Sequence, residues 1–162
     1  MFFSAFIFGF LAAALALVLE LILIAPASFS ETVGLSWSIK GLAVLAIIAV
    51  IEEACKYLLL SRYLLRFASD STSRTAQTLL IGTFFGLGFA ALELSLAYRA
   101  TDLPHSGLGF FGIALLHIAT SLALVFLMNR SEQRTLRGVI APVGIATGIH
   151  LLYNILISLL GT

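Results

Sequence analysis

Five predominantly apolar stretches, each about 20 residues long, constrain this chain more than any other feature of its sequence. They cover residues 2–24, 39–60 or slightly beyond, 76–98, 108–128 and 138–160. A helix of about 20 apolar residues crosses the hydrocarbon core of a bilayer, and every backbone group in lipid must be satisfied within such a segment. The sequence therefore predicts an all-α, polytopic transmembrane bundle of about five spanning helices, forming a single transmembrane domain over residues 1–162.

The composition supports a protein embedded in the membrane. Hydrophobic residues make up 60% of the chain and charged residues only 10%, whereas ordinary soluble domains carry about 25% charged residues. The net charge of +1 gives no sign of a nucleic-acid partner. The first stretch, followed by "APA" at 25–27, has some features of a signal peptide, but it lacks a basic start and is long for one. We therefore interpret it as a span.

Basic residues in the short loops predict the orientation. Lys40 and Arg99 are the basic residues beside the loops after the first and third stretches. The loops after the second and fourth stretches have more of them, namely Arg62, Arg66, Arg74, Arg130, Arg134 and Arg137. Cytoplasmic loops carry the excess of Lys and Arg. We expect the amino terminus to be cytoplasmic and the carboxyl terminus to be outside.

The motif "IEEACKY" at 51–57 places charge inside the second stretch. A charge near mid-membrane costs about 2.5–3.5 kcal/mol on insertion scales. Lys56 follows Glu52 by four residues and Glu53 by three, so it shares a helix face with both and can neutralise one. A self-contained ion pair is the simple structural explanation, but it needs only one glutamate. The second glutamate suggests a function.

Three other stretches carry polar groups at related depths. Glu93 lies in the third, His117 in the fourth with Thr120 one turn later, and His150 in the fifth with Asn154 four residues on. Intramembrane ionisable groups face the bundle interior and pair with one another. The sequence therefore predicts that these side chains and the two adjacent glutamates line one polar cavity.

Small residues suggest how the helices approach one another. Gly82 and Gly86 in the third stretch, and Gly144 and Gly148 in the fifth, have the small-xxx-small spacing that permits close packing of transmembrane helices. We expect both pairs to bring the polar faces together. Glu20, near the outer end of the first stretch, can reach the interface, and we interpret it as structural.

This set of groups allows two kinds of amide hydrolysis. A buried glutamate can act as general base on water, while histidine and asparagine stabilise an oxyanion. Alternatively, two histidines and a carboxylate can hold a catalytic zinc. The chain contains no HExxH and no GxSxG motif, which argues against the proteases that these motifs define.

The polar motifs together resemble a known family. "EEACK" at 52–56, "FAALE" at 89–93, His117 with Thr120 after it, and "HLLYN" at 150–154 are similar to the PrsW branch of the PrsW/CAAX-protease superfamily. The resemblance covers residues 39–160 and leaves the first stretch peripheral. It implies an intramembrane protease of the bacterial or archaeal cell membrane that cleaves membrane-protein or membrane-anchored substrates, as PrsW-type proteins do with anti-sigma factors.

The resemblance also implies roles for individual residues. Glu52 and Glu53 would include the water-activating base, and His117 and His150 would bind the oxyanion or a metal. The remaining motif residues would support them. Asn154 would orient or polarise the reacting groups, and Lys56 would hold the glutamate pair in register. Glu93 and Thr120 would also have supporting roles. A divalent metal such as zinc, held by Glu53, His117 and His150, is possible, but Lys56 would compete with it, which slightly favours catalysis without a tightly bound metal.

Two other functions are compatible with the sequence. A non-catalytic scaffold of the same superfamily would keep the histidines for packing but would not need the double glutamate. A proton or ion conduit would use the same groups as a relay, but it predicts ionisable groups strung across the whole membrane. Most of the groups here cluster near one level, which favours the protease.

Overall fold

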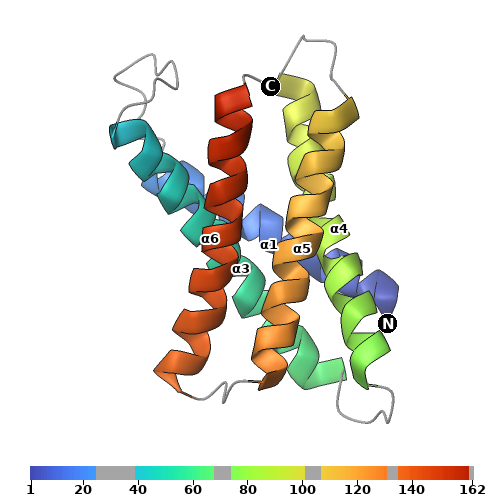
Figure 1. Ribbon diagram of the computed structural model, residues 1–162. Coiled ribbons are helices and arrows are strands. Elements are labelled where there is room, and N and C mark those ends of the chain that lie inside the picture. Colours follow the sequence, from blue (N-terminus) through green and yellow to red (C-terminus); the bar gives the residue numbers. More distant parts are fainter. Residues whose placement is uncertain (25–38, 68–73, 101–106, 131–134, 161–162) are drawn as a thin grey trace.

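The computed structural model describes residues 1–24, 39–67, 74–100, 107–130 and 135–160. These residues form five helices (Figure 1). They are α1 (Phe2–Leu23), α3 (Ile39–Phe67), α4 (Arg74–Ala100), α5 (Gly107–Arg130) and α6 (Leu136–Leu160). The all-helical prediction is confirmed, and several helices extend a few residues beyond the predicted apolar stretches, because helical geometry continues into the polar flanks.

Four of the helices, α1, α4, α5 and α6, are long and apolar enough to cross a membrane. The fifth, α3, is excluded from that group by the charges in its middle, Glu52, Glu53 and Lys56. It has 29 residues and is therefore about 44 Å long at about 1.5 Å per residue, more than the roughly 30 Å of a hydrocarbon core. The structure is that of a polytopic membrane protein whose most highly charged helix is also its longest.

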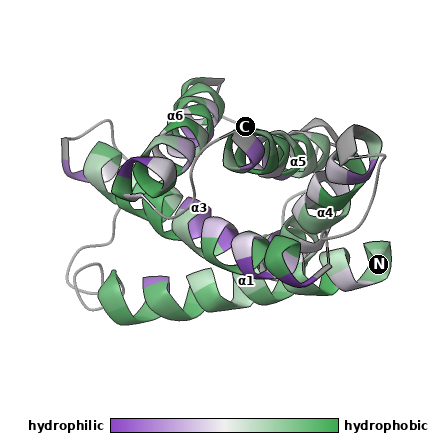
Figure 2. Ribbon diagram, turned by 90° about the horizontal axis from the view of Figure 1, so that it is seen from below, coloured by the Kyte–Doolittle hydropathy of each residue, from purple (hydrophilic) through white to green (hydrophobic). Residues whose placement is uncertain are grey.

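Large apolar side chains are exposed on every helix. Examples from α1, α3, α4, α5 and α6 in turn are Phe3, Leu65, Leu79, Phe111 and Leu152, each more than half exposed. In Figure 2 most of the helical ribbon has the colour of hydrophobic residues. A soluble protein rarely exposes so much apolar surface, whereas lipid tails accept it.

Helix α1 lies along one side of the bundle and crosses α4 and α3 obliquely (Figure 2). Its buried face consists of small residues, Ala5, Gly9, Ala12, Ala13 and Ala16. Small side chains allow close approach of transmembrane helices. This close contact positions the carboxyl-terminal end of α1 beside the polar groups of α3 and α4.

Most of the basic residues lie at one end of the bundle. The carboxyl ends of α3 and α5 and the amino ends of α4 and α6 lie at the same end of the bundle (Figure 1). Five of the six arginines counted above are in these helix ends, and Arg134 lies outside the described residues. The helix ends beside the two arginine-rich loops therefore lie on one side, as the charge pattern behind the orientation prediction requires.

Only one of the two predicted glycine contacts is present. A Cβ on Gly86 would lie 2.5 Å from the carbonyl oxygen of His117, and one on Gly82 would lie 2.9 Å from a side-chain methyl of Leu122. These glycines bring α4 directly against α5, as expected. The expectation for α6 was wrong, because no atom comes within 4 Å of a Cβ built on Gly144 or Gly148. Helix α6 turns these glycines outward, and their exposed face makes no helix contact among the described residues.

Candidate active site

Lys56 is the centre of a buried polar network. Its side chain is fully buried, and its Nζ lies 2.6 Å from Glu53 Oε1, 2.8 Å from His117 Nδ1 and 3.0 Å from Thr120 Oγ1. An ammonium group has three protons and accepts no hydrogen bond. The three contacts therefore satisfy it completely. They join α3 to α5 through a charge that would otherwise be costly in an apolar interior.

The lysine also fixes the tautomer of His117. Because the ammonium donates to Nδ1, the imidazole is neutral and carries its proton on Nε2. That Nε2–H donates to Glu93 Oε2 on α4. The ring packs against Phe89, with ring centroids 4.7 Å apart, and Lys56 Nζ lies 4.4 Å from the centroid of the same phenyl ring. Three helices thus hold His117 in one orientation.

His150 brings α6 into the same network. Its Nδ1 lies 2.9 Å from Glu53 Oε1 and 3.8 Å from Glu52 Oε2. Its ring is roughly perpendicular to that of His117, with centroids 5.5 Å apart. The predicted convergence of α3, α4, α5 and α6 is therefore confirmed, but the side chains form a packed network, and the two histidines do not line the pocket described below.

The two adjacent glutamates have different surroundings. Glu53 is fully buried, and its Oε1 is shared by Lys56 and His150. Glu52 is 8% exposed, and its Oε2 is buried without a hydrogen-bond partner. A buried, unbonded carboxylate oxygen is costly and is rare in native structures without a reason. Among the described residues, Glu53 Oε2 also lacks a hydrogen-bond partner, but Glu53 does not line the pocket described next, whereas Glu52 does.

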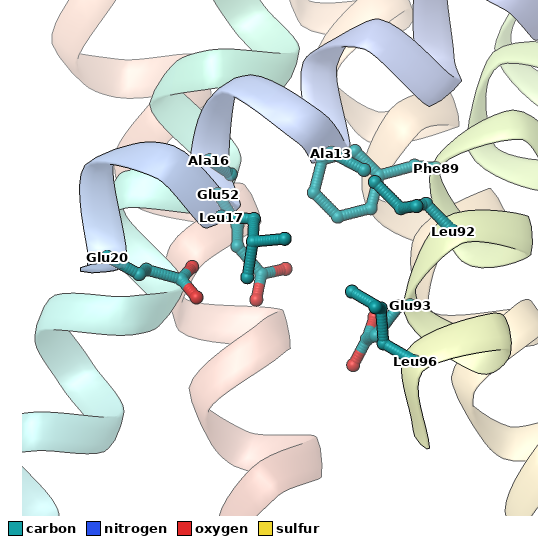
Figure 3. Close-up of a pocket in the computed structure, with 9 residues that line it drawn as sticks. All are labelled: Ala13, Ala16, Leu17, Glu20, Glu52, Phe89, Leu92, Glu93 and Leu96. Carbon is teal, nitrogen blue, oxygen red and sulfur yellow. The ribbon is translucent and has the colours of Figure 1, made fainter. Parts of the chain in front are cut away.

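The unbonded Glu52 Oε2 belongs to a residue that lines a small pocket between α1, α3 and α4 (Figure 3). The pocket holds about 60 Å³, enough for several water molecules. Glu20, Glu52 and Glu93 provide its carboxylates. Its apolar walls are formed by Ala13, Ala16, Leu17, Phe89, Leu92 and Leu96. Water could therefore reach Glu52 at a site that is otherwise enclosed by hydrocarbon.

Glu52, His117 and His150 are also a possible metal site. Their ligand atoms all lie within 4.8 Å of one another, and one carboxylate with two imidazoles matches known catalytic zinc sites. The unbonded Glu52 Oε2 fits this role. Both ring nitrogens of His117 already have partners, so a metal there would have to replace either the contact with Lys56 or the contact with Glu93. The group contains Glu52 and not the expected Glu53, whose Oε1 lies next to the Lys56 ammonium.

Two residues differ from their expected positions. Asn154, one turn after His150 on α6, is half-buried, and its side chain forms no hydrogen bond among the described residues. Glu20, interpreted from the sequence as an interfacial residue, points instead into the pocket beside Glu52 (Figure 3). The sequence contained a signal for it, because Glu20 is the single charged residue of α1.

Comparison with known proteins agrees with this arrangement. No curated protein and no solved structure matches the chain. The sequence profile of the PrsW family, described as intramembrane metalloproteases, matches residues 1–162, which is the full length of the sequence. The resemblance of the polar motifs is thereby confirmed. The chain belongs to the PrsW family of intramembrane metalloproteases and is a membrane-embedded peptide hydrolase.

Proposed function

We propose that this protein cleaves membrane-embedded or membrane-proximal peptide bonds with water activated by Glu52. The observation that carries the proposal is the difference between the glutamates. Each glutamate has one buried oxygen without a partner among the described residues, but Glu53 is bonded through its other oxygen to Lys56 and His150, whereas Glu52 lines a pocket large enough for water. A general base must be within hydrogen-bond reach of the proton it removes. Glu52 meets this requirement for a water in the pocket.

The remaining groups divide the other tasks of hydrolysis. Glu52 takes a proton from water as the water oxygen bonds to the peptide carbon. His117 Nε2–H, which donates to Glu93 in the structure, would turn its hydrogen bond to the developing oxyanion once substrate displaces Glu93. Preorganised donors of this kind stabilise the transition state strongly. The peptide C–N bond then breaks, and the leaving amine takes up a proton.

His150 is suited to passing on to the amine the proton that Glu52 took from water. Glu53 accepts its Nδ1–H, which orients the ring and leaves Nε2 free to exchange a proton. Lys56 balances the charge of Glu53 and so keeps this carboxylate from acting as a second base. Thr120 assists by accepting from the same ammonium. In this scheme Glu53, Lys56 and Thr120 position the reacting groups and do not touch the substrate.

A divalent metal such as zinc also fits the site. Glu52, His117 and His150 would hold it, and when bound it would polarise the substrate carbonyl and acidify water. The family description supports a metal. Metal content and activity must therefore be measured together.

The expected substrate is a single membrane-spanning or membrane-anchored segment. The basic helix ends favour a cytoplasmic position for the end of the bundle that contains Arg62, Arg66 and Arg137. The amino terminus would then be inside and the carboxyl terminus outside, in a bacterial or archaeal cell membrane. A reporter fused after residue 162 should score as external, and a cytoplasmic score would reverse the orientation.

The central test is cleavage of a single-span reporter by purified protein in liposomes, with and without a chelator. We expect the parent and Ser95→Ala to cleave it, because Ser95 is exposed and bonds only within its own helix among the described residues. We expect Glu52→Gln and His150→Ala to lose cleavage while remaining folded by gel filtration. If both folded variants cleave at the parental rate, the proposed site is wrong and a scaffold role replaces it.

A further inference from the structure

The pocket contains a carboxylate to which the proposed mechanism gives no role. Glu20 comes from α1, and its side chain points toward that of Glu52, with Glu93 on the opposite wall (Figure 3). Glu20 Oε1 is buried without a hydrogen-bond partner. The residue therefore bears an unbonded carboxylate oxygen at the entrance to the proposed active site.

The negative charge of this pocket is not balanced by the described residues that line it, because none of them is basic. The nearby ammonium of Lys56 is bonded to Glu53, His117 and Thr120. A second observation points to a ligand. Glu52 is more than nine-tenths buried, it lines the pocket, and its Oε2 has no hydrogen-bond partner. Unpaired carboxylates in an apolar setting require a proton or a cation.

The spacing argues against a metal ion shared by the three carboxylates. In the part of the chain that the structure describes, the one group able to hold an ion joins Glu52 to the two histidines, and it includes neither Glu20 nor Glu93. The pocket is nevertheless large enough for a side chain. Its volume of about 60 Å³ accommodates on the order of four to six water-sized groups, which is comparable to the five non-hydrogen atoms of a lysine side chain.

We infer that the pocket between α1, α3 and α4 binds a basic side chain of the substrate, next to the bond that is cut, and that Glu20 determines this specificity. This inference rests on the proposed function. The aliphatic part of the basic side chain would lie against Leu17, Leu92 and Leu96, and its charged end would lie beside Glu20, which leaves the Glu52 side of the pocket to the water. Long basic side chains combine apolar stems with charged ends in this way. Glu20 contributes the charge that no other part of the mechanism requires.

The test compares two versions of a single-span peptide in proteoliposomes. At each of the three positions on either side of the cleaved bond, lysine is exchanged for norleucine, which has nearly the same shape without the charge. The measured quantity is the ratio of kcat/KM for the lysine and norleucine peptides. We expect a ratio of at least about ten at one position, since losing one partner of a desolvated charge pair is costly.

Variants at Glu20 test whether this residue causes the preference for the lysine peptide. Glu20→Gln should lower the ratio toward one, and Glu20→Asp should retain most of it. Leu21→Gln is the matched control, because it introduces the same amide on the exposed face of the same turn and should keep the parental ratio. The inference is overturned if Glu20→Gln keeps the parental ratio, or if the parent shows no preference at any position.

A binding measurement separates this inference from the proposed function. The same peptides with a methylated scissile nitrogen resist cleavage, and their Kd values can be measured with the parent and with Glu20→Gln. If no peptide is cleaved, the proposed function fails, but a lysine preference that depends on Glu20 still supports the cation pocket. Equal Kd values for the lysine and norleucine peptides contradict the pocket, whether or not cleavage occurs.

Discussion

The buried network around Lys56 and the pocket at Glu52 lie side by side in the same membrane protein, yet they treat charge in opposite ways. In the network, the ammonium is satisfied by three acceptors and Glu53 Oε1 is bonded on two sides, although Glu53 Oε2 has no partner among the described residues. In the pocket, Glu20 and Glu52 each retain a buried oxygen without a partner. The difference teaches that one part of the site maintains its geometry, while the other is prepared to receive water or substrate.

The contrast begins at two consecutive positions of α3. Successive residues of a helix point about 100° apart, so Glu53 bonds to His150 on α6, whereas Glu52 lines the pocket between α1, α3 and α4. A bonded carboxylate is a poor base because its charge is already stabilised, whereas an unbonded one has most to gain from a proton. The following predictions test this division, beginning with the largest expected effect.

Glu52→Gln should remove catalysis without weakening the fold. The change keeps the shape of the side chain but eliminates the base, for which general-base catalysis accounts for roughly 10²–10⁴-fold in rate. Single-turnover cleavage of the reporter measures the loss, and thermal unfolding in detergent should show stability equal to or above that of the parent. A variant that retains more than a tenth of the parental rate would assign the base elsewhere.

Lys56→Met should have the opposite profile, with loss of stability as its primary effect. It leaves Glu53 as a buried charge without its ammonium partner, and breaking such a pair costs about 3–5 kcal/mol. Denaturant unfolding measures the change. The double variant Lys56→Met, Glu53→Leu should recover much of the stability, because apolar replacement of a whole buried pair is often neutral. Full recovery of cleavage in that double variant would contradict a positioning role for the network.

Substitution of Glu52 and of Glu53 should weaken zinc binding to different extents. Glu53 orients His150 through Nδ1, and loss of such an outer partner typically weakens metal binding by about 10–100-fold. Glu52 is in the group that could coordinate the ion directly, so Glu52→Gln should weaken binding further than Glu53→Gln. Competition with a chelating dye measures both values on folded protein. Equal losses would mean that the two carboxylates share one role toward the metal.

The smallest effect concerns the glycines that position the network. Gly86→Ala would place a Cβ 2.5 Å from the His117 carbonyl oxygen, and overpacking of this kind costs about 1–3 kcal/mol. Gly148→Ala meets open space and should leave stability unchanged or raise it by up to about 1 kcal/mol, because alanine has the higher helix propensity. Parallel thermal unfolding compares the two. A larger loss at Gly148 would show that α6 packs against another molecule through this face.

Much of the fold followed from the sequence, because lipid permits few alternatives. Apolar length predicted the five helices within a few residues, and the rarity of charge in lipid marked Glu52, Glu53, Lys56, His117 and His150 as interior groups. Convergence of these groups followed from the same physics, since polar side chains in lipid find one another. Their individual roles remain predictions that the experiments above can test.

Other features depended on how the helices are rotated and tilted against one another. The sequence presented Glu52 and Glu53 as equals, Glu20 as interfacial, and the glycine pairs of α4 and α6 as alike. Packing separated them, because Gly86 lies against α5 while Gly148 faces away, and the small residues of α1 bring Glu20 beside Glu52. Sequence by itself determined which residues avoid lipid. Only the tertiary structure decided which partner each one meets, because a helix fixes the angle between its own side chains but not the direction of its neighbours.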